Sequence, residues 1–299
     1  MALSSTSIIN YNGDKKLNFF QAIIWLFGNI LNNFFPNINI DQRINILKFK
    51  FHSKDLIYLD ENKYLSPSRY LCDLFWLNFP FTKIKSNNSL QLKICEVGCG
   101  TGVYPNLLQK IIGKNKLHYT GIDIKKYREW ENFDNKNFKF IIDQSDNIKN
   151  HLDKIDVLFT QSAIEHFEKD LLFFKNISNY VANSNKPLLQ IHLIPSHKCL
   201  FNFLNHGFRQ YTLRNISKFT KLFNHNSNIY LYKLEGFKAN TIHRQFITYP
   251  RILKLKDKRL SKNNEYIKAI KKVLDQRLDN KQLTFYALVI SSNQKFILK

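Results

Sequence analysis

The segment best suited to specific chemistry is Ile94-Cys95-Glu96-Val97-Gly98-Cys99-Gly100-Thr101-Gly102, an apolar run that ends in closely spaced glycines. A strand that ends in a Gly-x-Gly turn lets the backbone approach a nucleotide, because glycine adopts positive φ and has no obstructing side chain. Val103 occupies the position where a dinucleotide-binding loop has a third small residue, and Glu96 would repel a pyrophosphate. The segment therefore disfavours NAD and favours a nucleotide ligand that carries positive charge.

A second acidic residue follows at the spacing that ribose recognition requires. Apolar residues at helical spacing predict a helix over residues 104–111, which Gly113 ends, and alternation predicts a strand over residues 117–124. That strand delivers Asp123, 21 positions after Gly102, and an acidic residue about 20 positions on binds ribose hydroxyls. S-adenosylmethionine combines a ribose with an ammonium and a sulfonium group. The two carboxylates are suited to that ligand.

The whole pattern resembles motif I of the class I S-adenosylmethionine-dependent methyltransferases, in which E-x-G-x-G-x-G follows the first strand. The resemblance implies a Rossmann-like fold and a methyltransferase activity. It also implies that residues at later strand ends contact the adenine and the methionine moiety; Asp146 competes with Asp143 for the adenine amine. The expected cofactor-binding residues are Glu96, Gly98, Cys99, Gly100, Gly102, Asp123, Ile124, Asp143, Gln144 and Gln161.

Five further apolar runs continue the pattern of strands separated by helices. Strands are predicted at residues 138–142, 156–161 and 188–194, and a final antiparallel pair at 229–234 and 284–290, with a helix over 266–278 between its members. This order predicts a doubly wound α/β sheet that is mostly parallel and has an antiparallel last strand. Ligands of such sheets lie at the carboxyl ends of the strands, which is where the residues above are found.

Both ends of the chain exceed this sheet. We expect residues 1–89 to form an N-terminal helical extension that covers the cofactor, and residues 90–299 to form the methyltransferase domain, with a basic insertion at about 197–280 that shapes the acceptor site. Residues 17–35 are rich in Phe, Ile and Leu but are interrupted by five Asn or Gln side chains. They favour a helix packed on the protein over an amphipathic helix on a membrane.

Methylation of a hydroxyl requires a base, and histidine titrates near neutral pH. The segment from Gln161 to His166 resembles the "LEH" signature that follows the fourth strand in many small-molecule methyltransferases. His192 lies in the fifth strand, and His206 follows it in the insertion. We therefore expect the catalytic base among His166, His192 and His206, although a structural histidine is an equal alternative for His166.

The segment at residues 205–212 resembles segments of methyltransferases encoded near bacterial surface-polysaccharide genes. His206, Arg209 and Tyr211 offer a base, an anion donor and a ring that stacks on a sugar. The alternative is an ordinary surface turn around Gly207. The resemblance implies a saccharide acceptor.

The net charge of +22 is concentrated in the second half of the chain. Residues 187–299 contain 21 Lys/Arg and 5 Asp/Glu. Such an excess favours an anionic acceptor, a membrane surface or RNA, although an AT-rich genome also inflates lysine. The Asn/Asp-Pro-Pro-Tyr/Phe motif of enzymes that methylate exocyclic amines is absent after the fourth strand, where residues 160–163 read Thr-Gln-Ser-Ala. The absence of this motif disfavours methylation of nucleic-acid bases.

The four cysteines form no C-x-x-C pair, so neither a zinc cluster nor a disulfide framework is expected, and no metal is assigned. Residues 1–6 lack the pattern of a secretion signal. We expect a cytoplasmic protein, with a peripheral position at the inner membrane face as an alternative. The favoured function is methyl transfer from S-adenosylmethionine to a small-molecule or saccharide hydroxyl. An RNA methyltransferase and a non-catalytic binding protein are the alternatives, and a NAD-dependent oxidoreductase is the least favoured.

Overall fold

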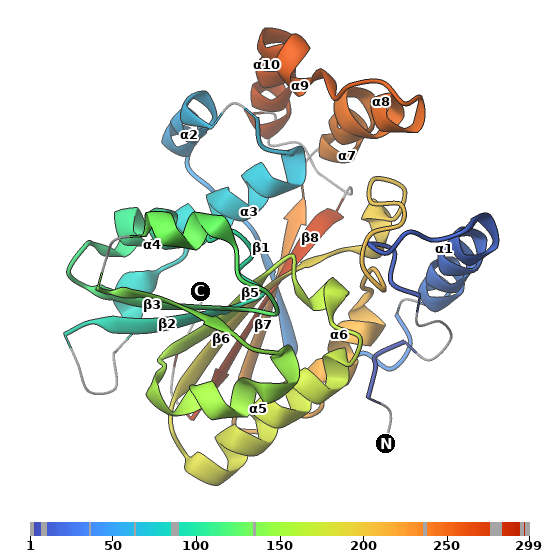
Figure 1. Ribbon diagram of the computed structural model, residues 1–299. Helices are drawn as coiled ribbons and strands as arrows, with labels where there is room; N and C mark the ends of the chain where they lie inside the picture. The colour runs from blue at the N-terminus through green and yellow to red at the C-terminus, as the bar shows by residue number, and fades with distance from the viewer. Residues whose placement is uncertain are drawn as a thin grey trace.

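The computed structural model describes residues 3–6, 11–35, 37–62, 64–84, 90–133, 136–235, 238–275, 283–293 and 296. Its centre is one eight-stranded sheet with the order β1-β7-β8-β6-β5-β2-β3-β4 (Figure 1). The strands are β1 (Ile44–Lys48), β2 (Leu92–Val97), β3 (Leu117–Asp123), β4 (Phe138–Ile142), β5 (Val157–Gln161), β6 (Leu188–Pro195), β7 (Asn228–Glu235) and β8 (Leu283–Ser292).

The sheet is parallel except at β8, which pairs antiparallel with both β6 and β7. This confirms the predicted Rossmann-like, doubly wound sheet with an antiparallel last strand. The order reverses direction at β2, which pairs with β3 on one side and with β5 on the other. In doubly wound sheets, a ligand binds outside the carboxyl ends of the strands at such a reversal. The sheet therefore places its ligand site between the segments that follow β2 and β5.

Helices and turns cover both faces of the sheet. One apolar core joins the sheet to α3, α4, α7 and α10, and the other joins it to α5 and α6. Strands buried on both faces are expected to read as continuous apolar runs, as β6 and β8 do. The helices are α1 (Phe19–Asn33), α2 (Ile57–Glu61), α3 (Pro67–Asn78), α4 (Tyr104–Ile112), α5 (Asp170–Ser184), α6 (Leu213–Thr220), α7 (Ala239–His243), α8 (Tyr249–Ile252), α9 (Lys258–Ser261) and α10 (Asn263–Asp275).

The N-terminal extension contains a strand that the sequence pattern did not predict. β1 pairs parallel with β7 at the edge of the sheet, with Ile44 opposite Ile229. It is short and half-exposed, so its sequence lacks the apolar run that identified the inner strands. The helix predicted at 266–278 corresponds to α10, and residues 276–278 lie outside the described part of the chain.

Helix α1 packs on the protein through a narrow strip that includes the fully buried Trp25. Its buried residues are Trp25, Gly28 and Asn29, whereas Phe19 and Phe20 are each 74% exposed. The polar Asn29 thus faces the protein and the phenylalanines face solvent. Among the described residues, no helix has the length and apolar character needed to cross a membrane.

Candidate functional site

The glycine loop after β2 adopts the backbone conformation that its glycines permit. Gly98, Gly100 and Gly102 have φ of 77°, 53° and 80°, in the left-handed region that favours glycine. A Cβ atom on Gly98 would lie 2.5 Å from the Cβ of Ala163, whereas one on Gly100 would meet no heavy atom within 4 Å. Gly98 therefore lets the loop pack against the segment after β5, and Gly100 faces open space.

Asp123, at the end of β3, is tied directly to this loop. Its Oδ2 accepts a hydrogen bond from the backbone N–H of Gly100 at 2.8 Å, and its Oδ1 accepts one from the N–H of Ile124 at 2.8 Å. The side chain of Ile124 is exposed beside it, as is that of Val103 across the loop. Trp130 donates from Nε1 to the carbonyl of Gly100 at 2.8 Å. The carboxylate of Asp123 thus holds the glycine loop in place and lies beside the open space at Gly100.

Glu96 and Cys99 lie beneath the loop rather than on its surface. Glu96 is only 2% exposed, and its carboxyl group accepts a hydrogen bond from the hydroxyl of Tyr119. Burial raises the pKa of Glu96 to about 8, because a charged carboxylate loses its hydration there. A cation bound near Glu96 would favour the charged form. The thiol of Cys99 is buried close to Gly121.

Asp143 and Gln144 follow β4, the neighbour of β3. The carboxylate of Asp143 accepts hydrogen bonds from Asn147 Nδ2 at 2.7 Å and from the backbone of Gln144 at 2.8 Å, and its Oδ2 lies 2.8 Å from His151 Nε2. These hydrogen bonds lower the pKa of Asp143. Its own N–H donates to the carbonyl of Asp123 at 2.9 Å, which brings the two strand ends together.

Gln161 ends β5 and contributes an unsatisfied donor to the same edge. Its Oε1 accepts a hydrogen bond from Trp76 Nε1 on α3 at 3.0 Å, but its buried Nε2 has no partner. A buried donor without a partner costs free energy unless a ligand or water satisfies it. The Nε2 group of Gln161 is therefore suited to donate a hydrogen bond to a bound molecule.

Helix α3 supplies residues that the sequence analysis missed. The guanidinium of Arg69 donates to the hydroxyl of Tyr104, and that hydroxyl donates to Asp73 at 3.0 Å. The positive charge of Arg69 is close enough to Glu96 to offset part of the rise in pKa that burial causes. Arg69 follows a helix cap in the extension, and its sequence carries no motif that would have singled it out.

Two histidines and one carboxylate meet where the segments after β5 and β6 approach each other. Nδ1 of His166 lies 2.6 Å from Asp14 Oδ2, and Nδ1 of His206 lies 3.1 Å from Asp14 Oδ1. The two rings are 4.7 Å apart and nearly perpendicular. All three side chains are partly exposed, so they remain open to a ligand.

The charges in this cluster stabilise the protonated form of His166. Burial opposes the charged form of His166, but the hydrogen bond and charge of Asp14 and the charge of Glu165 outweigh it and raise the pKa of His166. Burial also opposes the ionised form of Asp14. Hydrogen bonds from His166 and His206 nevertheless hold the pKa of Asp14 well below its usual range.

The same three side chains are a potential metal-ligand set, because their ligand atoms lie within 4.8 Å of one another. However, the 2.6 Å separation between His166 Nδ1 and Asp14 Oδ2 is that of a hydrogen bond. The paired atoms satisfy each other and leave no space between them. The geometry therefore fits a hydrogen-bonded pair better than a metal centre.

His192 is not brought to this cluster. It is fully buried in the sheet, with Nδ1 3.0 Å from the hydroxyl of Thr160 and its ring 4.9 Å from that of Phe174. Burial lowers its pKa to about 3, which keeps the imidazole neutral. His192 thus has the environment of a core residue.

Arg209 and Tyr211 require a correction, because neither is available to an acceptor. Arg209 is 1% exposed and forms an ion pair with the buried Asp170 at 3.0 Å, while donating to the carbonyl of Phe167. Tyr211 is also fully buried, and its hydroxyl donates to Asp170 at 3.0 Å. Both side chains hold the loop in place, and only His206 of the three residues faces the site.

A buried carboxyl group, that of Glu165, lies next to His166 in the sequence. Glu165 is 1% exposed, burial raises its pKa, and its Oε2 has no hydrogen-bond partner. A Cβ atom on Gly207 would lie 2.6 Å from the carbonyl oxygen of Glu165. The segment after β5 and the loop around Gly207 are therefore in direct contact.

No protein-family model matches the sequence, and no curated protein is significantly similar to it. Among solved structures, the chain is similar to a plantazolicin methyltransferase in complex with a triazolic desmethyl analogue and SAH, with 14% identity, a TM-score of 0.43 and coverage of 81% of this chain and 91% of that one.

It is also similar to coclaurine N-methyltransferase bound to N-methylheliamine and SAH, with 11% identity, a TM-score of 0.45 and coverage of 93% and 88%. A third is phosphoethanolamine N-methyltransferase 2 of Haemonchus contortus, in complex with phosphomonomethylethanolamine and SAH. That comparison has 11% identity, a TM-score of 0.42 and coverage of 81% of this chain and 61% of the nematode chain.

Proposed function

We propose that the protein is an S-adenosylmethionine-dependent methyltransferase that acts on a hydroxyl group of a small acceptor. The observation that carries the proposal is the opening beside Gly100. That opening is bordered by the carboxylate of Asp123, and the unpartnered amide of Gln161 ends the neighbouring strand. S-adenosylmethionine needs both groups, because its ribose hydroxyls donate hydrogen bonds and the carboxylate of its methionine moiety accepts them.

The chain offers a partner for each part of this cofactor, which supplies a methyl group on a sulfonium. The carboxylate of Asp123 would accept hydrogen bonds from the ribose hydroxyls, and the exposed side chains of Val103 and Ile124 would flank the adenine ring. Asp143 and Gln144 are suited to the adenine amine.

The methionine moiety needs partners of both signs. Glu96 supplies negative charge below the loop, and Arg69 supplies positive charge from α3 for the carboxylate. We assign Glu96 to the ammonium group and Arg69 to the carboxylate, with Gln161 as a donor beside them.

The base in this proposal is His166. Asp14 binds Nδ1, so the tautomer with its proton on Nδ1 presents a lone pair at Nε2 for the acceptor's hydroxyl proton. The contact between Gly98 and Ala163 supports a short path from this segment to the cofactor loop. His206 binds the other carboxylate oxygen and is the second candidate.

The acceptor class follows from the same residues. A histidine held by a carboxylate matches a hydroxyl, which must lose a proton as it attacks. We propose a saccharide or related small molecule that is methylated in the cytoplasm, and the charge of the C-terminal half supports an anionic one. With Arg209 and Tyr211 buried, the acceptor's anion and ring contacts must come from other side chains.

Transfer of labelled methyl groups into fractionated cell extract tests this function. The expected result is label in a glycan or small-molecule fraction with the wild-type protein and none with Asp123→Ala. Label confined to RNA would indicate an RNA methyltransferase instead. No transfer to any fraction, despite tight binding of S-adenosylhomocysteine, would leave a binding protein.

A further inference from the structure

Three exposed apolar segments remain unexplained by the proposed site. The first is the outward side of α1, where Phe19, Phe20, Phe27 and Leu31 are between 52% and 74% exposed. Helix α1 contains no charged residue, and the exposed lysines Lys15 and Lys16 lie a few residues before its first turn. Large apolar side chains that face water together mark a surface that binds something apolar.

The second segment begins in the last turn of α8 and continues beyond it in the C-terminal insertion. Residues 251–256 read Arg-Ile-Leu-Lys-Leu-Lys, and all six are exposed. Tyr249 and Leu260 extend the apolar surface on either side. Between residues 238 and 262 the chain carries far more Lys/Arg than Asp/Glu, with Asp257 as its one acidic residue. An ordinary charged surface segment would bury its apolar residues in the core. Here the apolar side chains between the lysines are exposed instead.

The third segment is the loop at residues 201–210, which lies between the other two and contacts helices on both sides. Trp25 of α1 donates from Nε1 to the carbonyl of Gly207 at 2.9 Å, and the N–H of Gln210 donates to Asn29 at 3.0 Å. On the other side, the ring of Phe203 lies 5.1 Å from that of His243 on α7. In Figure 1 this loop runs between α1 and the helices α7 and α8. Its own Phe201 and Leu204 are exposed.

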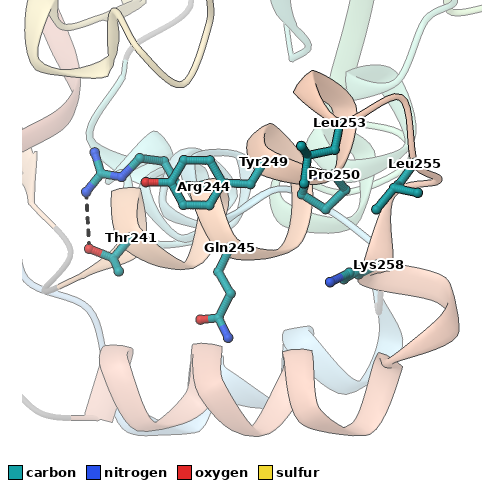
Figure 2. A pocket seen from close by; sticks show the side chains of 8 residues that line it. All are labelled: Thr241, Arg244, Gln245, Tyr249, Pro250, Leu253, Leu255 and Lys258. Carbon is teal, nitrogen blue, oxygen red and sulfur yellow. Dashed lines mark hydrogen bonds between the residues drawn. The ribbon is translucent and has the colours of Figure 1, made fainter.

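A shallow pocket in the insertion combines the same two kinds of side chain. It has a volume of about 500 Å³, and Figure 2 shows Leu253, Leu255 and Pro250 around it with Lys258 and Arg244. An apolar hollow with cationic groups at its rim has the chemistry of a site for an anionic amphiphile.

From these observations we infer that α1, residues 201–204 and residues 249–260 form a docking face for the surface of an anionic phospholipid bilayer. Aromatic and aliphatic side chains enter the headgroup boundary, and the surrounding lysines and arginines meet the lipid phosphates. Charge complementarity selects the bilayer over a second copy of this chain, because the insertion would meet its own positive charge in a dimer. Docking by this face does not depend on methyl transfer.

The docking face also borders the histidine cluster. His206 belongs to the loop between β6 and α6, which contacts both α1 and α7, and its ring lies 5.8 Å from that of Phe203. A protein docked in this way presents the cluster to molecules held in the membrane surface. An acceptor attached to a lipid would then reach His166 without leaving the bilayer.

Co-sedimentation with vesicles tests the docking face. The full-length protein is expected to bind vesicles of phosphatidylcholine and phosphatidylglycerol in equal parts, and to bind pure phosphatidylcholine at least about tenfold more weakly. High salt should weaken the binding, because the Debye length is only about 3 Å at 1 M.

Variants separate this face from nonspecific attraction. Phe20→Ser with Phe27→Ser, and separately Lys254→Glu with Lys256→Glu, should each reduce vesicle binding by about tenfold or more. The matched controls are Leu90→Ser and Lys114→Glu with Lys116→Glu, which change exposed residues near the opposite edge of the sheet. Circular dichroism and thermal melting verify that each variant is folded.

Two results would overturn the inference. One is equal binding by the variants and their controls, which would leave only general attraction of a basic protein. The other is self-association in light scattering that the Phe20→Ser, Phe27→Ser variant abolishes while vesicle binding is absent, which would assign the face to a second copy.

Discussion

Asp14 and His166 are 152 positions apart in the sequence, yet their side chains form a hydrogen bond of 2.6 Å at the edge of the sheet. The N-terminal segment reaches this position because Gly13 donates to the carbonyl of Gly207 at 2.8 Å. A Cβ atom on Gly13 would lie 2.4 Å from the backbone of Asn205, so the approach requires glycine. The extension therefore completes a cluster whose other members follow β5 and β6.

Replacement of the proposed base tests this cluster directly. We expect His166→Ala to lower kcat by about 10²- to 10⁴-fold and to leave the affinity for S-adenosylhomocysteine unchanged, because only proton transfer is lost. Steady-state kinetics and calorimetry measure the two quantities. His225→Ala, in an exposed turn, is the control. Full activity of His166→Ala and of His206→Ala would exclude histidine base catalysis and favour an amine or thiol acceptor.

The pH profile tests the role of Asp14 separately. Asp14 contributes to the raised pKa of His166, and a base acts only when it is deprotonated. The rate should therefore rise with pH through a midpoint above the usual value for histidine. In Asp14→Asn that midpoint should move to lower pH, because the neutral amide no longer stabilises the imidazolium. An unchanged midpoint together with an unchanged rate would assign Asp14 a purely structural role.

Glu96 predicts a pH dependence of stability. Its pKa is about 8 in the folded chain and near 4.5 when unfolded, so the folded chain retains a proton that the unfolded chain releases. Stability should fall as pH rises between these values, by at most about 1.4 kcal/mol per unit. Glu96→Gln should flatten this decline in denaturant titrations at pH 6 and pH 8. Exposed Glu129→Gln is the control, and an equal slope in all three proteins would contradict the burial argument.

Metal removal distinguishes the two interpretations of the histidine cluster. Because Asp14 and His166 satisfy each other, treatment with EDTA should leave methyl transfer and melting temperature unchanged. A loss of activity that zinc or manganese restores would show that the three side chains hold a metal instead.

Local patterns predicted those parts of the fold that depend on neighbouring residues. The glycines around Gly100 and the alternation in β2 to β6 carry their own signal, since turn geometry and burial act within a few residues. β1 escaped prediction because five half-exposed residues lack that signal. The exposure of Phe19 was likewise hidden, because the spacing of apolar residues along a helix does not say which face meets the protein.

Contacts between distant segments account for the misplaced site residues. Arg209 looks like an anion donor in sequence, and only the tertiary structure places Asp170 beside it. Asp14 sits in a loop without a motif, so no sequence signal connects it with His166. Functional sites assembled from several segments are predicted only as far as each segment has its own pattern.

Isothermal calorimetry with S-adenosylhomocysteine tests the proposed cofactor site most directly. We expect micromolar binding by the wild-type chain and none by Gly100→Val, whose branched side chain would fill the opening and strain a φ of 53°. Asp123→Ala should weaken binding by about 1–3 kcal/mol, from the loss of charge-assisted hydrogen bonds. Micromolar binding of NAD with no response to S-adenosylhomocysteine would contradict the assignment of this site.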